Sequence, residues 1–327
     1  MTFLLPAMAV LLLASVGLAS QPLVPPASVS GIWQAGAFVG CPPSAAPLQV
    51  QAYDTQTFIL REDLSVTREA PFLYLLVGRE RAMLIDTGDV AEAGRMPLEA
   101  TVRDLLPGEG AAKLPLVVVH SHGHLDHRLG DGQFANLAGV EVVSSDHASV
   151  QRYFGFTAWP EGTVSLDLGG RIIDVLPAPG HHPAHVLFYD RNTGLLFSGD
   201  FLLPGRVLVD DLAAYRASAK RVGAFVKDRT MTAVLGAHIE KNQAGQLFPW
   251  QAATHPDEHA LALTKADLLA LPAALQDFNG LYTETGGFVM ENPFRLLLLS
   301  GAAFILVLSG LVVVGFRFIR RRRRSVE

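Results

Sequence analysis

The sequence predicts an α+β domain followed by one apolar helix near the C-terminus. Three observations support this prediction. Short runs rich in β-branched and aromatic residues, such as residues 72–77 and 117–119, have the composition of strands. Between and after them, hydrophobic residues recur at three- and four-residue intervals, which is typical of amphipathic helices. The third observation is an uninterrupted run without charge at residues 296–316.

Length and composition limit the possible functions. The chain has 327 residues, of which 50% are hydrophobic, so it can hold one large domain or two small ones. Its formal net charge is −5, and its basic residues form no footprint for nucleic acid, so nucleic acid is not an expected partner. The single cysteine, Cys41, can form neither an internal disulfide nor a multi-cysteine metal site.

The strand and helix patterns alternate through the middle of the chain. Strands at residues 72–77 and 82–85 are joined by a short charged turn. A helix at residues 98–106 ends at Pro107-Gly108, and the strand at residues 117–119 completes a strand–helix–strand unit. The later elements that we expect are strands at residues 140–143, 171–176, 186–190, 195–197 and 233–235, a helix at residues 212–225 and a helix starting near Thr264.

Both termini carry segments that predict export and anchoring. Residues 1–20 have the apolar core and small residues of a signal peptide, although no Lys or Arg precedes the core and an uncleaved anchor is the alternative. Residues 21–49 are rich in Pro, Ala and Ser and are interpreted as a linker or covering segment. Residues 246–294 form a C-terminal extension.

The run at residues 296–316 predicts a transmembrane helix, so the lipid bilayer is an expected partner. At about 1.5 Å per residue it is long enough for a hydrocarbon core of about 30 Å. Arg317 and Arg320 to Arg324 follow it, which places the basic tail, residues 317–327, in the cytoplasm. We therefore expect a single-pass membrane protein whose large N-terminal part lies on the extracytoplasmic (periplasmic or extracellular) side.

A cluster of potential metal ligands follows the predicted strand at residues 117–119. It contains His122, His124, Asp126 and His127. Imidazole and carboxylate groups are ligands that Zn²⁺ takes from proteins. In a loop at a strand end, His122 and His124 can converge on one ion. Asp126 and His127 are adjacent and more naturally serve a second ion beside the first.

The motif His122-x-His124-x-Asp126-His127 resembles the signature of the metallo-β-lactamase-fold hydrolases. Later residues resemble the other ligand positions of that family in the same order: His181 in Pro-Gly-His, Asp200 in Ser-Gly-Asp and His238 in Gly-Ala-His. The resemblance covers about residues 50–245, which we take as the catalytic domain. It implies the four-layer αββα sandwich of that family.

The resemblance also implies a dinuclear centre with two divalent metal ions, expected to be Zn²⁺. The implied ligands of one ion are His122, His124 and His181, those of the other are Asp126, His127 and His238, and Asp200 bridges the two. Asp126 is in addition the expected catalytic proton shuttle. His181 is preferred over its neighbour His182 because the family places its ligand directly after Pro-Gly.

Two further residues are expected to support the site without binding metal. Asp86 lies in an Asp-Thr-Gly turn at a strand end, and the resemblance implies that it orients the metal-binding imidazoles. An Asx turn without a metal role is the alternative. His185 is expected to be a structural or substrate-side histidine.

Two other segments leave two interpretations open. Phe156 and Trp159 lie in an aromatic segment without helical or strand periodicity, so they either pack in the core or line an apolar wall of the substrate pocket. Asp257, Glu258 and His259 are expected in a solvated loop, with the rim of the active site as the alternative.

The function that the resemblance implies is hydrolysis of an ester, thioester, lactone or amide bond in a small-molecule substrate by a metal-bound hydroxide. Zinc β-lactamases of one major class use cysteine where this chain has Asp200, so the ligand pattern is similar to that of glyoxalase II and lactonases. Two alternatives remain open. One is an oxidoreductase similar to the persulfide dioxygenases, with a single iron, and the other is a non-catalytic, metal-stabilised binding module tethered to the membrane.

Overall fold

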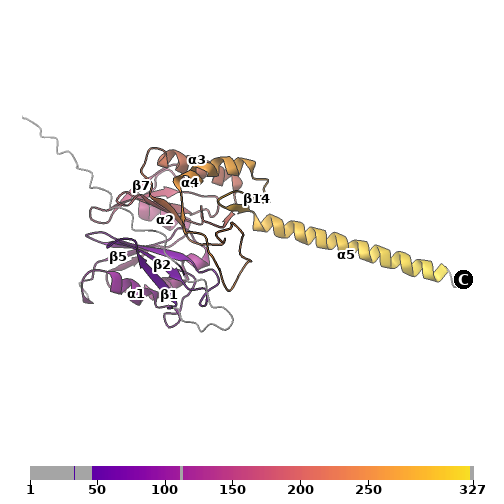
Figure 1. Cartoon of the computed structure of the whole chain (residues 1–327), viewed down its shortest axis with the longest axis horizontal. Helices are drawn as coiled ribbons and strands as arrows, with labels where there is room; N and C mark the ends of the chain where they lie inside the picture. The colour runs from indigo at the N-terminus through magenta and orange to yellow at the C-terminus, as the bar shows by residue number, and fades with distance from the viewer. Residues whose placement is uncertain (1–32, 34–45, 111–112, 325–327) are drawn as a thin grey trace, which may run out of the picture.

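The computed structural model describes residue 33, residues 46–110 and residues 113–324. Two mixed six-stranded sheets are stacked on each other, and helices lie on both outer sides (Figure 1). The predicted signal peptide and most of the predicted linker lie outside the described residues.

The first sheet contains its strands in chain order. The first four strands run antiparallel to their neighbours, whereas the last two continue parallel to the fourth. They are β1 (Leu48–Ala52), β2 (Thr57–Glu62), β3 (Phe72–Val77), β4 (Ala82–Ile85), β5 (Leu116–Val119) and β6 (Val140–Val142). Two short 3₁₀ helices, η2 (Leu125–His127) and η3 (Leu129–Gln133), follow β5.

The second sheet has the order β13-β12-β10-β9-β8-β7 and includes one parallel pair, β10 with β12. Its strands are β7 (Val164–Asp167), β8 (Ile172–Pro177), β9 (Val186–Asp190), β10 (Leu195–Gly199), β12 (Ala233–Gly236) and β13 (Ala262–Leu263). A small third sheet contains β11 (Arg206–Leu208), β15 (Val289–Glu291) and β14 (Tyr282–Glu284).

The helices that pack against the sandwich in the described part of the chain are α1 (Leu98–Leu105), α2 (His147–Phe154), α3 (Leu212–Val226) and α4 (Lys265–Asp277). Their ends follow local chemistry. Asp146 caps α2 by accepting a hydrogen bond from the Ser149 backbone N–H at 3.0 Å, and Gly155 ends the helix in the left-handed conformation. Thr264 and Asp267 form a capping box at the start of α4.

Strand alternation sorts the core into three hydrophobic layers. In β3, Phe72, Tyr74 and Leu76 point into the layer between the two sheets, whereas Leu73 and Leu75 point into the layer beneath α1. The third layer lies between the second sheet and helices α3 and α4. Because both faces of each sheet are covered, most central strands are apolar at every position rather than alternating.

The sequence located most of these elements. The strands at β3, β4, β5, β6, β8, β9, β10 and β12 and the helices α1, α3 and α4 form close to their predicted bounds. Helix α2 was not predicted, and its last residues, Tyr153 and Phe154, directly precede the aromatic pair Phe156 and Trp159. The segment 246–294 is integrated into the sandwich, because it supplies β13, α4, β14 and β15.

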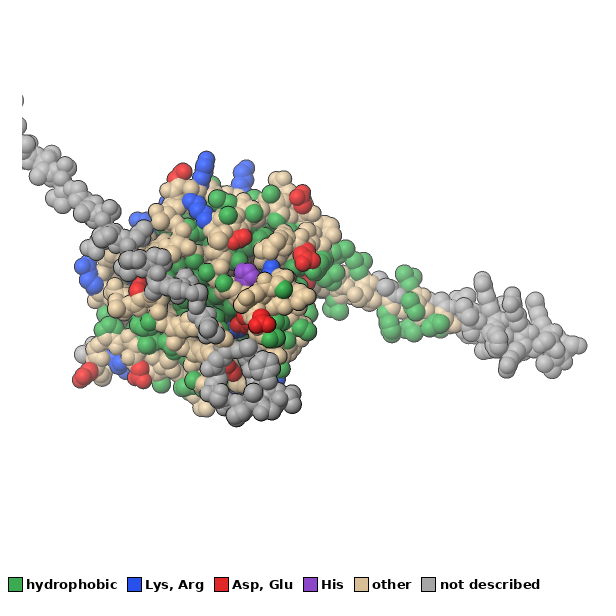
Figure 2. Space-filling view, viewed as in Figure 1, with side chains coloured by type: hydrophobic (Ala, Val, Ile, Leu, Met, Phe, Trp, Pro, Cys, Tyr) green, Lys and Arg blue, Asp and Glu red, His purple; other side chains and the backbone are tan. Residues whose placement is uncertain are grey.

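The C-terminal segment forms a single helix, α5 (Pro293–Arg324), which extends away from the sandwich (Figure 1). Figure 2 shows hydrophobic side chains along its described part. The prediction of a transmembrane helix at residues 296–316 is not confirmed: within the described residues, no helix is both long enough and apolar enough to cross a membrane. The uncharged run lies within a longer helix, which begins before Arg295 and ends at Arg324.

Candidate metal centre

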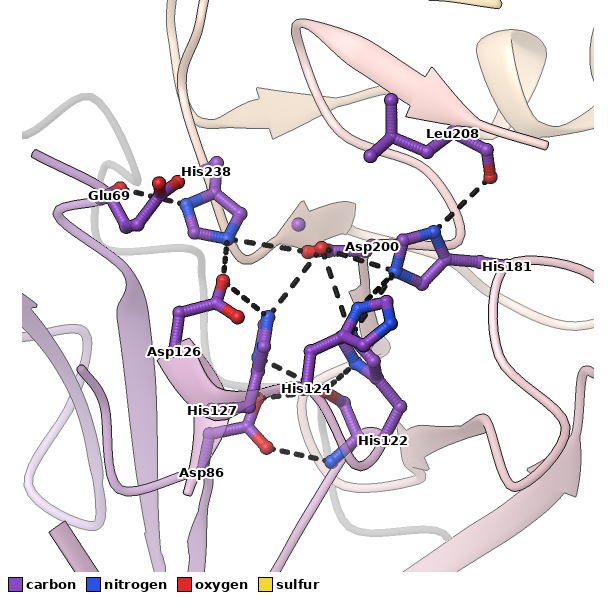
Figure 3. A network of polar contacts seen from close by, with 12 residues as sticks. Glu69, Asp86, His122, His124, Asp126, His127, His181, Asp200, Leu208 and His238 are labelled. Carbon is purple, nitrogen blue, oxygen red and sulfur yellow. Dashed lines mark hydrogen bonds and ion pairs between the residues drawn. The ribbon is translucent and has the colours of Figure 1, made fainter. Parts of the chain in front are cut away.

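The predicted ligands meet at one edge of the sandwich, because nearly all of them follow strands that end there (Figure 3). The first sheet supplies the residues after β5, including η2. The second sheet supplies one residue after each of β8, β10 and β12. The complete set is His122, His124, Asp126, His127, His181, Asp200 and His238.

Two glycines explain the local sequence before two of these residues. Gly180, which precedes His181, has a φ of 149°, and a Cβ there would lie 2.5 Å from the Cα of Tyr215. Gly199, which precedes Asp200, has a φ of 51°, and a Cβ there would lie 2.6 Å from the Cβ of Ser121. Glycine is therefore required at both strand ends for the ligand loops to pack this closely.

His122, His124 and His181 form the first ligand group. The ring nitrogens that face one another are His122 Nε2, His124 Nδ1 and His181 Nε2, and they lie 2.9 to 3.2 Å apart. Three imidazole nitrogens that converge on one point form the ligand arrangement that a cation requires. This group can hold one metal ion.

Asp126, His127, Asp200 and His238 form the second group. Asp126 Oδ2 lies 3.2 Å from His127 Nε2 and 3.3 Å from His238 Nε2. Asp200 stands between the two groups (Figure 3): its Oδ2 lies 3.5 Å from the Nε2 atoms of both His127 and His181. One carboxylate is thus shared by both ligand groups, as a bridging ligand has to be.

Unsatisfied atoms support the assignment of a metal site. His127 Nε2 and Asp200 Oδ1 are buried, and although each lies within ion-pair distance of a neighbour, neither makes a hydrogen bond to the described residues. Buried polar atoms in proteins are nearly always paired, so both atoms require a further partner. A divalent cation in the second group would supply it.

Hydrogen bonds on the outer side of three rings direct their Nε2 atoms inward. His238 Nδ1 donates to the carbonyl oxygen of Glu69 at 2.9 Å, and His181 Nδ1 donates to that of Leu208 at 3.2 Å. His127 Nδ1 lies 3.0 Å from Asp86 Oδ2. Each contact favours the tautomer that leaves an Nε2 lone pair for a metal ion.

The Asp86 carboxylate, which contacts His127, is itself held by hydrogen bonds from Ser121. Its Oδ1 accepts a hydrogen bond from the Ser121 backbone N–H at 2.7 Å, and its Oδ2 accepts one from the Ser121 hydroxyl at 2.8 Å. Its φ is 66°, in the left-handed region. This unusual backbone conformation places the carboxylate behind His127, which is the position that the sequence interpretation gave it.

The two ligand groups differ in charge. Burial and the surrounding imidazoles hold the pKa of His122 well below its usual value, so this ring is neutral, which is the metal-binding form. In the second group, burial opposes charge, but Asp200 and Asp126 raise the pKa of His238 to about 10. Burial likewise opposes ionisation of Asp126, yet His127 and His238 hold its pKa below the usual range. A metal ion entering the second group therefore displaces protons.

The comparison with protein families agrees with this geometry. Residues 66–238, which include all seven candidate ligands and Asp86, match the model of the metallo-beta-lactamase superfamily. The chain belongs to this superfamily.

Characterised relatives are similar over most of their length. Acyl-coenzyme A thioesterase MBLAC2 of Gallus gallus is 26% identical over 215 residues, which are 54% of this chain and 75% of that protein. Hydroxyacylglutathione hydrolase of Dechloromonas aromatica is 27% identical over 212 residues, 62% of this chain and 69% of that protein. Among solved structures, a metallo-beta-lactamase from Pontibacter korlensis has a TM-score of 0.48 at 19% identity and covers 71% of this chain and 100% of that one.

In this superfamily member, a pocket of about 390 Å³ opens onto both ligand groups. Its other walls are formed by residues that no sequence motif indicated. Arg206 and Leu208 come from β11, Glu240 lies just beyond His238, and Trp250 lies in the segment after it. Glu240 follows a predicted ligand closely and was the residue that the sequence could have indicated.

The proposed aromatic wall lies elsewhere. Phe156 and Trp159 are partly buried and pack against the layer between the sheets, and neither belongs to the lining of the pocket at the ligand groups. Trp159 also contacts the ring of His147, with 4.8 Å between centroids. The structure therefore supports the core-packing interpretation of this segment.

His185 is a buried neighbour that belongs to neither ligand group. Its ring stacks on His122 with 5.0 Å between centroids and an interplanar angle of 15°. Burial and the nearby His181 hold its pKa well below the usual value. It thus packs behind the first group as a neutral ring.

Proposed function

We propose that this metal-dependent hydrolase of the metallo-β-lactamase superfamily uses a dinuclear centre, loaded with two Zn²⁺ ions, to cleave a thioester or a related ester. The observation that carries the proposal is the position of Asp200. Its carboxylate lies within 3.5 Å of imidazole nitrogens in both ligand groups, so the two groups form one site.

The residues of each group would hold one ion. His122, His124 and His181 supply three neutral nitrogens for the first. The second group supplies Asp126, His127 and His238, and Asp200 contributes to both. Two bound divalent ions would lower the pKa of a coordinated water toward about 7 and polarise the carbonyl group under attack.

The protein side chains then position the reaction. The site contains only two carboxylates for two dications, so it keeps a positive charge, which favours an anionic tetrahedral intermediate. Asp126 lines the pocket, and its Oδ2 contacts both histidines of its group. We assign to Asp126 the transfer of the proton from water to the leaving group, in addition to metal binding.

The bond type is supported by the relatives. One is named as an acyl-coenzyme A thioesterase and the other as a hydroxyacylglutathione hydrolase, and both names specify an acyl group carried by a thiol compound. A thioester is therefore the first substrate class to test. Esters and lactones come next, because they are cleaved by the same attack on a carbonyl carbon.

A substrate panel tests the proposal. The zinc-loaded protein is assayed against acyl thioesters of N-acetylcysteamine, matched oxygen esters, a lactone and a phosphodiester. We expect thioester turnover that disappears on chelation and returns with zinc. Asp126→Asn should abolish turnover with the fold intact, and Asp257→Asn, which changes an exposed carboxylate outside the pocket, should keep it.

Several results would contradict the proposal. Turnover that survives chelation or the Asp126→Asn substitution would remove the assigned mechanism. If the phosphodiester were the sole compound of the panel to be hydrolysed, the substrate class would be phosphodiesters and not thioesters. Oxygen consumption with an iron-loaded protein and a persulfide, without hydrolysis of any panel member, would favour the oxidoreductase alternative.

A further inference from the structure

Leu125 and Trp250 are large hydrophobic side chains that the fold leaves in solvent at the metal pocket. They are 55% and 53% exposed, and both line the pocket. Among the described residues outside α5, only Val50, Leu269 and Tyr282 are other exposed large hydrophobics. Exposed apolar groups that gather at a pocket indicate a binding surface more strongly than scattered ones do.

The segment that carries Trp250 is held firmly in place. Arg206 Nη2 donates to the carbonyl oxygen of Phe248 at 2.6 Å, and the Phe248 ring stacks on His255 with 4.2 Å between centroids. Further along, Glu258 accepts two hydrogen bonds from the buried Arg61, both at 2.6 Å. The predicted solvated loop is thus anchored to the first sheet.

One face of the Trp250 ring is covered by Arg206. The Arg206 guanidinium carbon lies 4.5 Å from the centroid of its ring, within range of a cation–π contact. The neighbouring Gln251 donates to the side chain of Glu69, whose carbonyl oxygen in turn accepts from His238. The indole therefore sits on a rigid support that is connected to a candidate metal ligand.

The charged side chains of the lining are of both signs. Apart from the ligand groups, the described lining contains the carboxylates Glu69, Asp89 and Glu240 and the cations Arg68 and Arg206. Arg206 is paired with Glu240 at 3.3 Å, so Arg68 remains as the one cation without a carboxylate within ion-pair distance. Beside these charges, the lining offers the exposed apolar side chains of Leu125 and Trp250.

We propose that Leu125 and Trp250 form an apolar rim that binds an apolar, preferably aromatic, group next to the reacting carbonyl of the substrate. This assignment rests on the proposed function and names its substrate class: acyl compounds with an apolar or aryl group rather than small polar ones. A preordered indole loses little conformational freedom when a ring stacks on it, and such a stack favours binding.

Two carboxylates that differ by one phenyl ring, 4-phenylbutyrate and butyrate, test the apolar rim without catalysis. Both can reach the metals through the carboxylate, so the ratio of their dissociation constants isolates the ring. By calorimetry on the zinc-loaded full chain, we expect 4-phenylbutyrate to bind at least about fivefold more tightly. Trp250→Ala should reduce the ratio to about twofold or less, and Trp250→Phe should keep most of it.

Tyr282→Ala is the matched control, because Tyr282 is an exposed aromatic residue outside the pocket. In Tyr282→Ala, the ratio of the two dissociation constants should equal that of the unmodified protein. An unchanged ratio in Trp250→Ala, or no preference for 4-phenylbutyrate in the unmodified protein, would overturn the apolar rim. Thioester kinetics separate the two proposals: phenyl preference without any hydrolysis rejects the proposed function alone, whereas hydrolysis without phenyl preference rejects the apolar rim alone.

Discussion

The bidentate ion pair between Arg61 and Glu258 is expected to stabilise the whole domain. It joins residues 197 positions apart in the sequence, and the two side chains are only 2% and 8% exposed. Glu258→Gln preserves the shape but leaves the buried guanidinium without its counter-charge. Breaking a buried pair from one side typically costs about 3–5 kcal/mol, and since Gln keeps one acceptor we expect about 3 kcal/mol.

Urea unfolding of the full chain, followed by circular dichroism, measures this loss. Asp257→Asn is the control, since Asp257 is exposed and its φ of 53° is one that Asn also adopts. Its stability should change by less than about 0.5 kcal/mol. The double variant Arg61→Met, Glu258→Met should recover much of the loss, because it removes both buried charges.

A loss below about 1 kcal/mol in Glu258→Gln would refute this reasoning. It would mean that water reaches Arg61 or that the pair contributes no more than a surface salt bridge. The same result would weaken the case that Trp250 is held rigidly, because the pair anchors the segment that carries it.

Three further predictions follow from burial and position. Burial raises the pKa of Glu62 from 4.5 to about 8, so the native state keeps a proton that the unfolded chain releases. Urea unfolding should show the stability of the metal-free protein, relative to Glu62→Gln, falling as pH rises from about 4.5 to 8, by up to about 1.4 kcal/mol per pH unit; a flat difference would contradict the shift. Trp159→Ala should lower stability by about 2 kcal/mol and leave KM unchanged, because Trp159 packs against the core outside the pocket; a raised KM at unchanged stability would return it to the pocket. In metal analysis, His181→Ala should lose bound zinc and His182→Ala should retain it, and the opposite pattern would reverse the choice between the neighbours.

The candidate ligands were predicted mainly from a resemblance, because short local motifs match those of the metallo-β-lactamase-fold hydrolases. Each follows an apolar strand, and glycines before His181 and Asp200 mark backbone positions where a side chain does not fit. The order of the residues along the chain then matches the order of strands that end at one edge. Neither signal depends on knowing which distant segments pack together.

The pocket walls could not be predicted in the same way. Trp250 is exposed, and what places it at the pocket is the contact of its segment with Arg206 and, through Glu258, with Arg61. These are pairings between distant residues that no local pattern records. Phe156 and Trp159 were a candidate wall because they lacked periodicity, but a bend after α2 turns them toward the core.

One missed element was within reach of the sequence. Asp146 at the start and Gly155 at the end of α2 are ordinary helix signals. The interpretation of residues 296–316 as a membrane span is not confirmed in the described part of the chain, where these residues belong to the longer helix α5.

The dinuclear assignment is tested most directly by the metal content of the full chain. The protein is saturated with zinc, freed of loosely bound ions and analysed by plasma mass spectrometry, together with His238→Ala. Because Asp200 contacts both ligand groups, we expect two ions per chain in the unmodified protein and about one in His238→Ala, in which the second group lacks a ligand. One ion per chain in the saturated, unmodified protein would contradict the dinuclear centre.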